Sequence, residues 1–177
     1  MQFSPSRIPG AWVIDISPIH DQRGFFAMTW LPDEFRKRGI EPALAQCNLA
    51  YNHKRGTLRG MHFQKPPHAQ AKIVRATRGS LLDVIVDLRP DSPAYRTWDS
   101  VELTAENRRM LYMPEGVAHG YLTLTDDVEA YYHASTPWAP HAESGVRWND
   151  PAFAIQWPFT PIVISEKDAT WPLVGPG

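Results

Sequence analysis

The sequence lacks the marks of several large protein classes. It has a single cysteine, Cys47, among 177 residues, which excludes an intrachain disulfide and a cysteine-rich zinc module and favours a reducing compartment, here the cytoplasm. The longest apolar run, 81–88, is interrupted by Asp83 and Asp87 and is too short and too polar to span a membrane. The first residues carry no apolar stretch after a basic start, so no secretory signal is expected.

The chain also lacks an excess of charge of either sign. The chain has 18 Lys and Arg against 19 Asp and Glu, a net charge of −1, with no block of one sign. Binding to nucleic acid relies on a basic surface that releases counterions, so nucleic acid is not an expected partner. An anionic ligand would have to meet a local cluster of cations.

Helical sequence is scarce. Only the segment 31–40 predicts a helix, because Pro32 suits a first turn, Asp33 and Glu34 lie at its start, basic residues lie near its end and Gly39 can stop it. The 17 prolines are about twice the usual share. They indicate many ordered turns between short elements.

Short strands follow one another from residue 46 onward, separated by turn residues such as Gly, Pro and Asp. This rhythm is typical of a β-sandwich or jelly roll. We therefore predict an all-β fold of two antiparallel sheets with one or two short helices, a single domain over 1–177, and a terminal segment of about thirty residues that covers the sheets. The clearest strands are 81–88, 100–105, 109–114, 120–125 and 128–134.

Two carboxylates stand out in the strand predicted over 81–88. Because side chains alternate along a strand, Asp83 and Asp87 share a face with Leu81 and Ile85. Isolated strand carboxylates usually point to water, but these apolar neighbours argue against that for at least one of the two. A ligand cavity between the sheets, lined by polar groups, accounts for the pattern better.

The pattern P-x-G-x-x-H, which ends at His119, matches half of the double motif of metal-binding cupins, a class of small jelly rolls. The other half needs a second histidine and a glutamate after His62, and this chain has Gln64 at the place of that second histidine. Two imidazoles are fewer than the three or four converging ligands that the metal of a cupin needs, and Lys72 nearby would repel a cation. No metal is therefore expected at this site.

His62 instead suits general-base chemistry, because an imidazole titrates near working pH. A structural, hydrogen-bonded histidine is the plainer alternative, but Arg59 and Lys72 close by indicate an anionic ligand or a developing oxyanion. Tyr131 and Tyr132 are adjacent in a strand and must face opposite sides. One of them can present its phenol to the cavity, and the periodicity does not say which.

Eight segments in the same order and spacing resemble the dTDP-4-dehydrorhamnose 3,5-epimerase family, and together they extend over nearly the whole chain. The resemblance implies a cupin-type jelly roll, a homodimer, no metal and no cofactor. It also implies inversion at C3 and C5 of a nucleotide-linked 4-keto-6-deoxyhexose. The segments are D-Q-R-G-F-F at 21–26, Q-x-N at 46–48, G-T-L-R-G-M-H-F-Q at 56–64, A-K-I-V-R at 71–75, D-V-I-V-D-L-R at 83–89, P-E-G-V-A-H-G at 114–120, W-N-D-P at 148–151 and S-E-K-D at 165–168.

Residue roles follow from the same resemblance. His62 resembles the base that removes the proton next to the ketone, and Asp168 resembles its orienting carboxylate. Lys72 resembles the cation beside the enolate oxygen, and Tyr132 the acid on the opposite face. The expected substrate-binding residues are His119 and Asp83 near the sugar, Arg23 and Arg59 at the diphosphate, Phe26, Met28, Gln46, Asn48 and Trp138 at the nucleoside, and Glu143 and Lys167.

The chain departs from the family pattern at four positions. Met28 stands where the family commonly has glutamate, Trp138 where it has tyrosine, Ala50 where it has serine and His133 where it has lysine. Loss of the glutamate removes an acceptor for a base N–H, while tryptophan keeps a stacking surface. The resemblance therefore leaves open which nucleobase is bound, and whether C3, C5 or both are inverted.

Two other functions remain as alternatives. The first is a metal-dependent cupin, oxygenase or isomerase, which only the P-x-G-x-x-H pattern favours. The second is a non-catalytic module that binds sugar nucleotides, which the altered nucleoside contacts favour.

Overall fold

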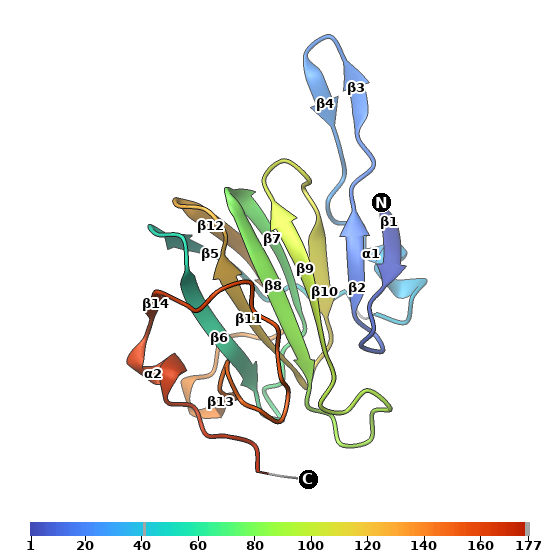
Figure 1. Ribbon diagram of the computed structural model, residues 1–177. Helices are drawn as coiled ribbons and strands as arrows, with labels where there is room; N and C mark the ends of the chain where they lie inside the picture. Colours follow the sequence, from blue (N-terminus) through green and yellow to red (C-terminus); the bar gives the residue numbers. More distant parts are fainter. Residues whose placement is uncertain (41, 176–177) are drawn as a thin grey trace.

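The computed structural model describes residues 1–40 and 42–175, and two β-sheets packed face to face form its body (Figure 1). We name each sheet by the strand that carries its main site residue. In the β12 sheet the order is β1 (Gln2–Pro5), β2 (Trp12–Asp15), β10 (Met110–Met113), β7 (Lys72–Arg78), β12 (Val128–Ala134) and β5 (Gln46–Asn52). In the β6 sheet it is β13 (Glu143–Gly145), β6 (Thr57–Gln64), β11 (Val117–Thr123), β8 (Ser80–Asp87) and β9 (Trp98–Thr104), with β14 (Val163–Ile164) beside β6.

Neighbouring strands in both sheets are antiparallel, except that β14 runs parallel to β6. The predicted all-β fold with two antiparallel sheets is thus confirmed. The strands expected over 81–88 and 128–134 coincide with β8 and β12 to within one residue.

Alternation along β8 explains how the sheets pack. Leu81 and Ile85 point inward and join the apolar core between the sheets, while Val84 and Val86 pack on the outer side of the β6 sheet. Asp83 and Asp87 share the inward face and are fully buried. The reading of these carboxylates as solvent-facing therefore does not hold for either one.

The helices are short, as expected. α1 (Pro32–Arg36) covers the outer face of the β12 sheet through the buried Phe35. It is shorter than the predicted helix over 31–40. The backbone N–H groups of Arg38 and Gly39 bond to carbonyls three residues back, so the α-helical pattern ends after Arg36. Gly39 then has a φ of +71°, a left-handed conformation that terminates helices. The others are the 3-10 helix η1 (Pro140–Ala142) and α2 (Glu166–Ala169).

The terminal segment forms the expected cover. Phe153 is buried against Met61, Val84 and Ala118 on the outer face of the β6 sheet, and Trp157 packs at its edge. No helix among the described residues is long and apolar enough to cross a membrane.

A hairpin of β3 (Ile19–Asp21) and β4 (Gly24–Phe26) projects away from the body of the sandwich (Figure 1). Every residue of its two strands is exposed, and Phe26 shows 65% of its surface. Exposed apolar side chains on a projecting arm are typical of a surface that contacts another molecule.

Candidate active site

A cavity lies between the two sheets, near the start of β7 and the end of β6. It consists of two adjoining hollows of about 280 Å³ and 240 Å³. Both hollows are lined by His62, Lys72, Tyr132 and Glu143. The cavity predicted from the buried carboxylate pattern is thus present, and charged and polar side chains surround it.

His62 and Tyr132 enter this cavity from opposite sheets, on β6 and β12. Tyr132 pairs with Val74 and Asn48 in the register of its sheet, and Tyr131 points to the other face. Burial raises the pKa of the Tyr132 phenol, and the charge of Glu143 adds to this effect while Arg59 opposes it. The phenol is therefore protonated at neutral pH and can donate a proton.

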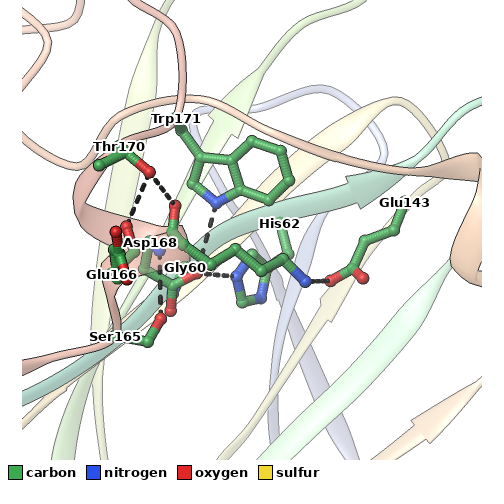
Figure 2. Close-up of polar contacts among 9 residues, drawn as sticks. Gly60, His62, Glu143, Ser165, Glu166, Asp168, Thr170 and Trp171 are labelled. Atoms are coloured by element: carbon green, nitrogen blue, oxygen red, sulfur yellow. Dashed lines mark hydrogen bonds and ion pairs between the residues drawn. The ribbon is translucent and has the colours of Figure 1, made fainter.

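Asp168 holds the imidazole of His62. Its Oδ1 lies 2.5 Å from His62 Nε2, and its carboxylate also accepts from the Gly60 backbone N–H at 3.2 Å and the Trp171 indole N–H at 3.3 Å (Figure 2). Burial alone would raise the pKa of Asp168, but the His62 contact and these donors outweigh it and keep the pKa below its ordinary value. A charged carboxylate behind the ring fixes its tautomer and stabilises an imidazolium.

Local sequence explains how Asp168 comes to be buried. Ser165 is the N-cap of α2, and its hydroxyl accepts from the Asp168 backbone N–H at 3.1 Å. The short helix turns the carboxylate inward toward β6 instead of outward to solvent. As a result, Asp168 is only 4% exposed although it lies on a short helix of the terminal segment.

Lys72 is the main cation inside the cavity. Burial lowers its pKa to about 8, although the carboxylates of Asp83 and Glu143 act in the opposite direction. The ammonium is still largely protonated at pH 7. It can therefore stabilise negative charge that develops on a ligand oxygen in this enclosed space.

His119 and Asp83 lie beneath Lys72 on neighbouring strands of the β6 sheet. His119 Nε2 is 2.6 Å from Asp83 Oδ1, a contact that is an ion pair when the imidazole is protonated. Asp83 is fully buried, and neither of its oxygens has a hydrogen-bond donor among the described residues. The negative charge of the Asp83 carboxylate favours the protonated form of Lys72.

The far end of the cavity suits a planar group. Gln46 accepts from the Trp138 backbone N–H at 2.8 Å and donates to Asn48 Oδ1 at 2.6 Å, so both amides are fixed beside an indole that is 58% exposed. On the other side, Arg59 donates to Asn52 Oδ1 at 2.8 Å and lines the second hollow. Its guanidinium is positioned for an anionic group.

Glu143 and Lys167 form an ion pair of 2.6 Å beside the cavity. Glu143 lies on β13, which pairs with β6, and Lys167 precedes Asp168 on α2. The ion pair therefore links the two segments that flank His62, as the close-up in Figure 2 illustrates.

Three expected site residues are not brought to the cavity within one chain. Arg23 and Phe26 lie on the projecting hairpin, and Arg23 is paired with Asp21 at 2.6 Å. Met28, just after the hairpin, is 47% exposed. The other twelve candidate residues line the cavity or contact residues that do.

Among residues 1–40 and 42–175, no group of three or more His, Cys, Asp and Glu side chains converges as a cupin-type metal centre would require. His62 and His119 are engaged by carboxylates, and Lys72 shares their cavity. The donor set therefore does not fit a cupin-type metal.

The sequence analysis did not identify two residues of the site. Trp171, which follows α2, contributes its indole N–H to Asp168, and no local pattern in the sequence indicates this contact. Gln64 lines the cavity and accepts from the Ala139 backbone N–H at 2.8 Å. Its place two residues after His62 on the same strand gave it the same inward face.

Comparisons with known proteins agree with this geometry. The sequence profile of the dTDP-4-dehydrorhamnose 3,5-epimerase family matches residues 5–175. A protein of that name from Sinorhizobium fredii is 44% identical over 173 residues, which are 97% of this chain and 89% of the relative.

Solved structures show the same likeness. A dTDP-4-dehydrorhamnose 3,5-epimerase from Elizabethkingia anophelis superposes with a TM-score of 0.94 at 32% identity, over 98% of this chain and 96% of that one. A 3'-monoepimerase from Streptomyces bikiniensis, solved with dTDP-quinovose, gives 0.88 at 36% identity over 96% and 86%. With its cavity, its fold and these matches, the chain belongs to the dTDP-4-dehydrorhamnose 3,5-epimerase family.

Proposed function

We propose that this chain epimerises a nucleotide-diphosphate-linked 4-keto-6-deoxyhexose, most simply dTDP-4-dehydro-6-deoxyglucose, at C3, C5 or both. One observation carries the proposal. His62 and Tyr132 enter one cavity from opposite sheets, with Lys72 lining the same space. Inversion at a carbon next to a ketone needs this arrangement, because a proton leaves one face of the sugar and another arrives on the opposite face.

The reaction divides into two proton transfers. His62 takes the proton from the carbon beside the ketone, and the electron pair moves to the ketone oxygen to form an enolate. Lys72 stabilises this oxygen, and Asp168 stabilises the imidazolium. Tyr132 then donates its proton to the carbon from the other face. The cycle leaves His62 protonated and Tyr132 ionised, so both must exchange a proton with solvent before the next turnover.

The other residues that line the cavity are suited to bind the nucleotide part of the substrate. Arg59 can hold a phosphate with its fork of N–H donors. Trp138, held next to Gln46 and Asn48, offers a surface on which a base can stack. Met28 provides no acceptor for an imide N–H, so selection among thymine, uracil, guanine and cytosine would rest on the two amides.

We further propose that the enzyme is a homodimer in which the β3–β4 hairpin of one copy reaches the cavity of the other. The hairpin is exposed, projects from its own sandwich and carries Arg23 and Phe26 away from their own cavity (Figure 1). A symmetric exchange would give each cavity a second arginine for the diphosphate and an aromatic ring for the base.

We place the enzyme in the cytoplasm, where the thiol of the exposed Cys47 stays reduced.

The test is isotope exchange. The protein is incubated in deuterated water with 4-keto-6-deoxyhexoses linked to dTDP, UDP, GDP or CDP, and the C3 and C5 ring protons are followed by NMR. Deuterium at either carbon supports the proposal, and the positions labelled separate 3,5-epimerisation from the single inversion named for the Streptomyces bikiniensis relative. Tight binding of all four nucleotides without exchange at either carbon would identify a binding module and reject an epimerase.

Variants test the two roles separately. His62→Ala should abolish exchange, because it removes the imidazole that takes the proton. Tyr132→Phe should retain exchange but slow inversion, since the proton can still leave and return on the His62 side. Full activity in both variants would refute the assignment of these residues.

A further inference from the structure

Two histidines outside the catalytic cavity face each other at the molecular surface. His68 follows β6 in the loop 65–71, and His141 lies on η1. Their Nε2 atoms are 3.2 Å apart, and their ring centroids are 4.8 Å apart with the ring planes at 87°. From this arrangement we propose a binding site for a divalent transition metal, with Zn²⁺ as the representative ion, that is independent of the epimerase reaction.

The geometry matches the spacing that zinc imposes on its ligands. Two imidazole nitrogens bound at the usual Zn–N distance and a tetrahedral angle lie about 3.3 Å apart, with ring centroids roughly 5 Å apart. The pair in this chain comes within a few tenths of an ångström of both values. Each ring would carry its proton on Nδ1 and present the lone pair of Nε2 to the ion.

The two segments are already held against each other, so little order would be lost on binding. The Lys65 backbone N–H donates to the Ala142 carbonyl at 2.9 Å, and Gln64 donates to the His68 carbonyl at 2.6 Å. The Lys65 carbonyl also accepts from the His68 backbone N–H at 3.0 Å. A site whose ligands sit on fixed backbone binds metal better than one whose ligands must be gathered.

The chemistry of the donors selects the ion. Imidazole suits Zn²⁺, Cu²⁺ and Ni²⁺, whereas Mg²⁺ and Ca²⁺ prefer oxygen ligands. Since no third His, Cys, Asp or Glu joins the pair among the described residues, water or a ligand oxygen would fill the remaining positions. The ion would clamp the loop 65–71 to η1, whose His141 lies two residues before Glu143 of the cavity wall.

Calorimetry with ZnCl₂ on protein stripped of metal tests this site. We expect one saturable zinc ion per chain, weakened roughly tenfold or more in His68→Gln and in His141→Gln, because even outer-shell losses cost at least tenfold in metal affinity. His53→Gln, which removes a histidine on a different segment, should bind like the wild type, and MgCl₂ should give no saturable heat.

A second measurement locates the ion directly. Zinc should shift the imidazole ¹⁵N resonances of His68 and His141 in NMR spectra and raise the melting temperature of the wild type, but not that of the double variant. Absence of saturable zinc binding, or binding that is the same in the double variant and the wild type, would overturn the proposal. Circular dichroism without zinc shows whether the variants are folded.

Discussion

At the scale of single residues, buried carboxylates decide which groups carry charge in the cavity. The Asp168 carboxylate contacts His62, whereas the carboxylates of Asp83 and Glu143 raise the pKa of Lys72. Each carboxylate has an opposite charge or N–H donors within reach of its position, which is the condition under which burying it is tolerable. His62 and Lys72 therefore depend on different carboxylates, and each dependence can be tested separately.

The first prediction concerns Asp168→Asn. The amide keeps the size of the side chain but lacks the charge that stabilises a protonated His62, so kcat should fall about 100-fold or more while KM changes little. Steady-state kinetics on the sugar nucleotide measure both. Glu166→Gln is the matched control, because this carboxylate is exposed on the same short helix. Wild-type kcat in Asp168→Asn would contradict the assigned role.

The second prediction concerns pH and Lys72. The group stabilises an enolate only while it is protonated, and its pKa is about 8. kcat/KM should therefore fall as the pH rises through about 8. Glu143→Gln removes a carboxylate that raises the pKa of Lys72, so in this variant the fall should move to lower pH.

A control separates this electrostatic effect from loss of the ion pair between Glu143 and Lys167. Lys167→Gln breaks the pair and leaves the carboxylate near Lys72, so its alkaline fall should not move to lower pH. Profiles of kcat/KM between pH 6 and 10 for the three proteins decide the matter. The same displacement in both variants would show that the ion pair, and not the charge of Glu143, sets the profile.

At the scale of elements, the site depends on how closely β13, β6 and α2 pack. Gly145 on β13 pairs with His62 on β6. A Cβ added at Gly145 would lie 2.4 Å from the ring of Trp171 and 2.7 Å from the Met61 carbonyl. There is no room for a side chain between the strand and the indole that donates to Asp168.

Gly145→Ala is accordingly predicted to push Trp171 outward and loosen Asp168 from His62. We expect the free energy of unfolding to fall by about 1–3 kcal/mol, as for other overpacked sites, and kcat to fall with it. Urea denaturation and steady-state kinetics measure the two effects. Gly175→Ala serves as control, because nothing lies within 4 Å of its added Cβ. An unchanged urea midpoint for Gly145→Ala would contradict the prediction, because it would show that Trp171 and its segment accommodate the methyl group.

The strands and helices could be predicted from the sequence more closely than the contacts between them. Alternation predicted β8 and β12 closely, because each strand has one face in the core. The end signals overestimated α1, because they placed its end at Gly39, whereas the last N–H groups before it bond to carbonyls only three residues back. The contact between His62 and Asp168 joins residues 106 positions apart. No local pattern predicts such a pairing, and only the family resemblance indicated it.

At the scale of the whole molecule, one chain does not bring all the expected substrate-binding residues to its cavity. Its cavity is lined by His62, Tyr132 and Lys72, but Arg23 and Phe26 lie on the hairpin of β3 and β4, which projects away from it (Figure 1). In the proposed homodimer each cavity is completed by the hairpin of the other copy. This exchange predicts that two different inactive chains can restore activity when they are combined.

The decisive case combines Arg23→Ala with His62→Ala. In a mixed dimer, one cavity lacks His62 and receives the altered hairpin, whereas the other keeps His62 and receives a normal Arg23. Random re-association of equal amounts gives half mixed dimers, each with one intact site of two, so about a quarter of wild-type activity should return. Unfolding the mixture together, refolding it and assaying it measures this, and separately refolded variants give the baseline. If Arg23 instead served the cavity of its own chain, every site in the mixture would carry one lesion, and activity would stay at that baseline.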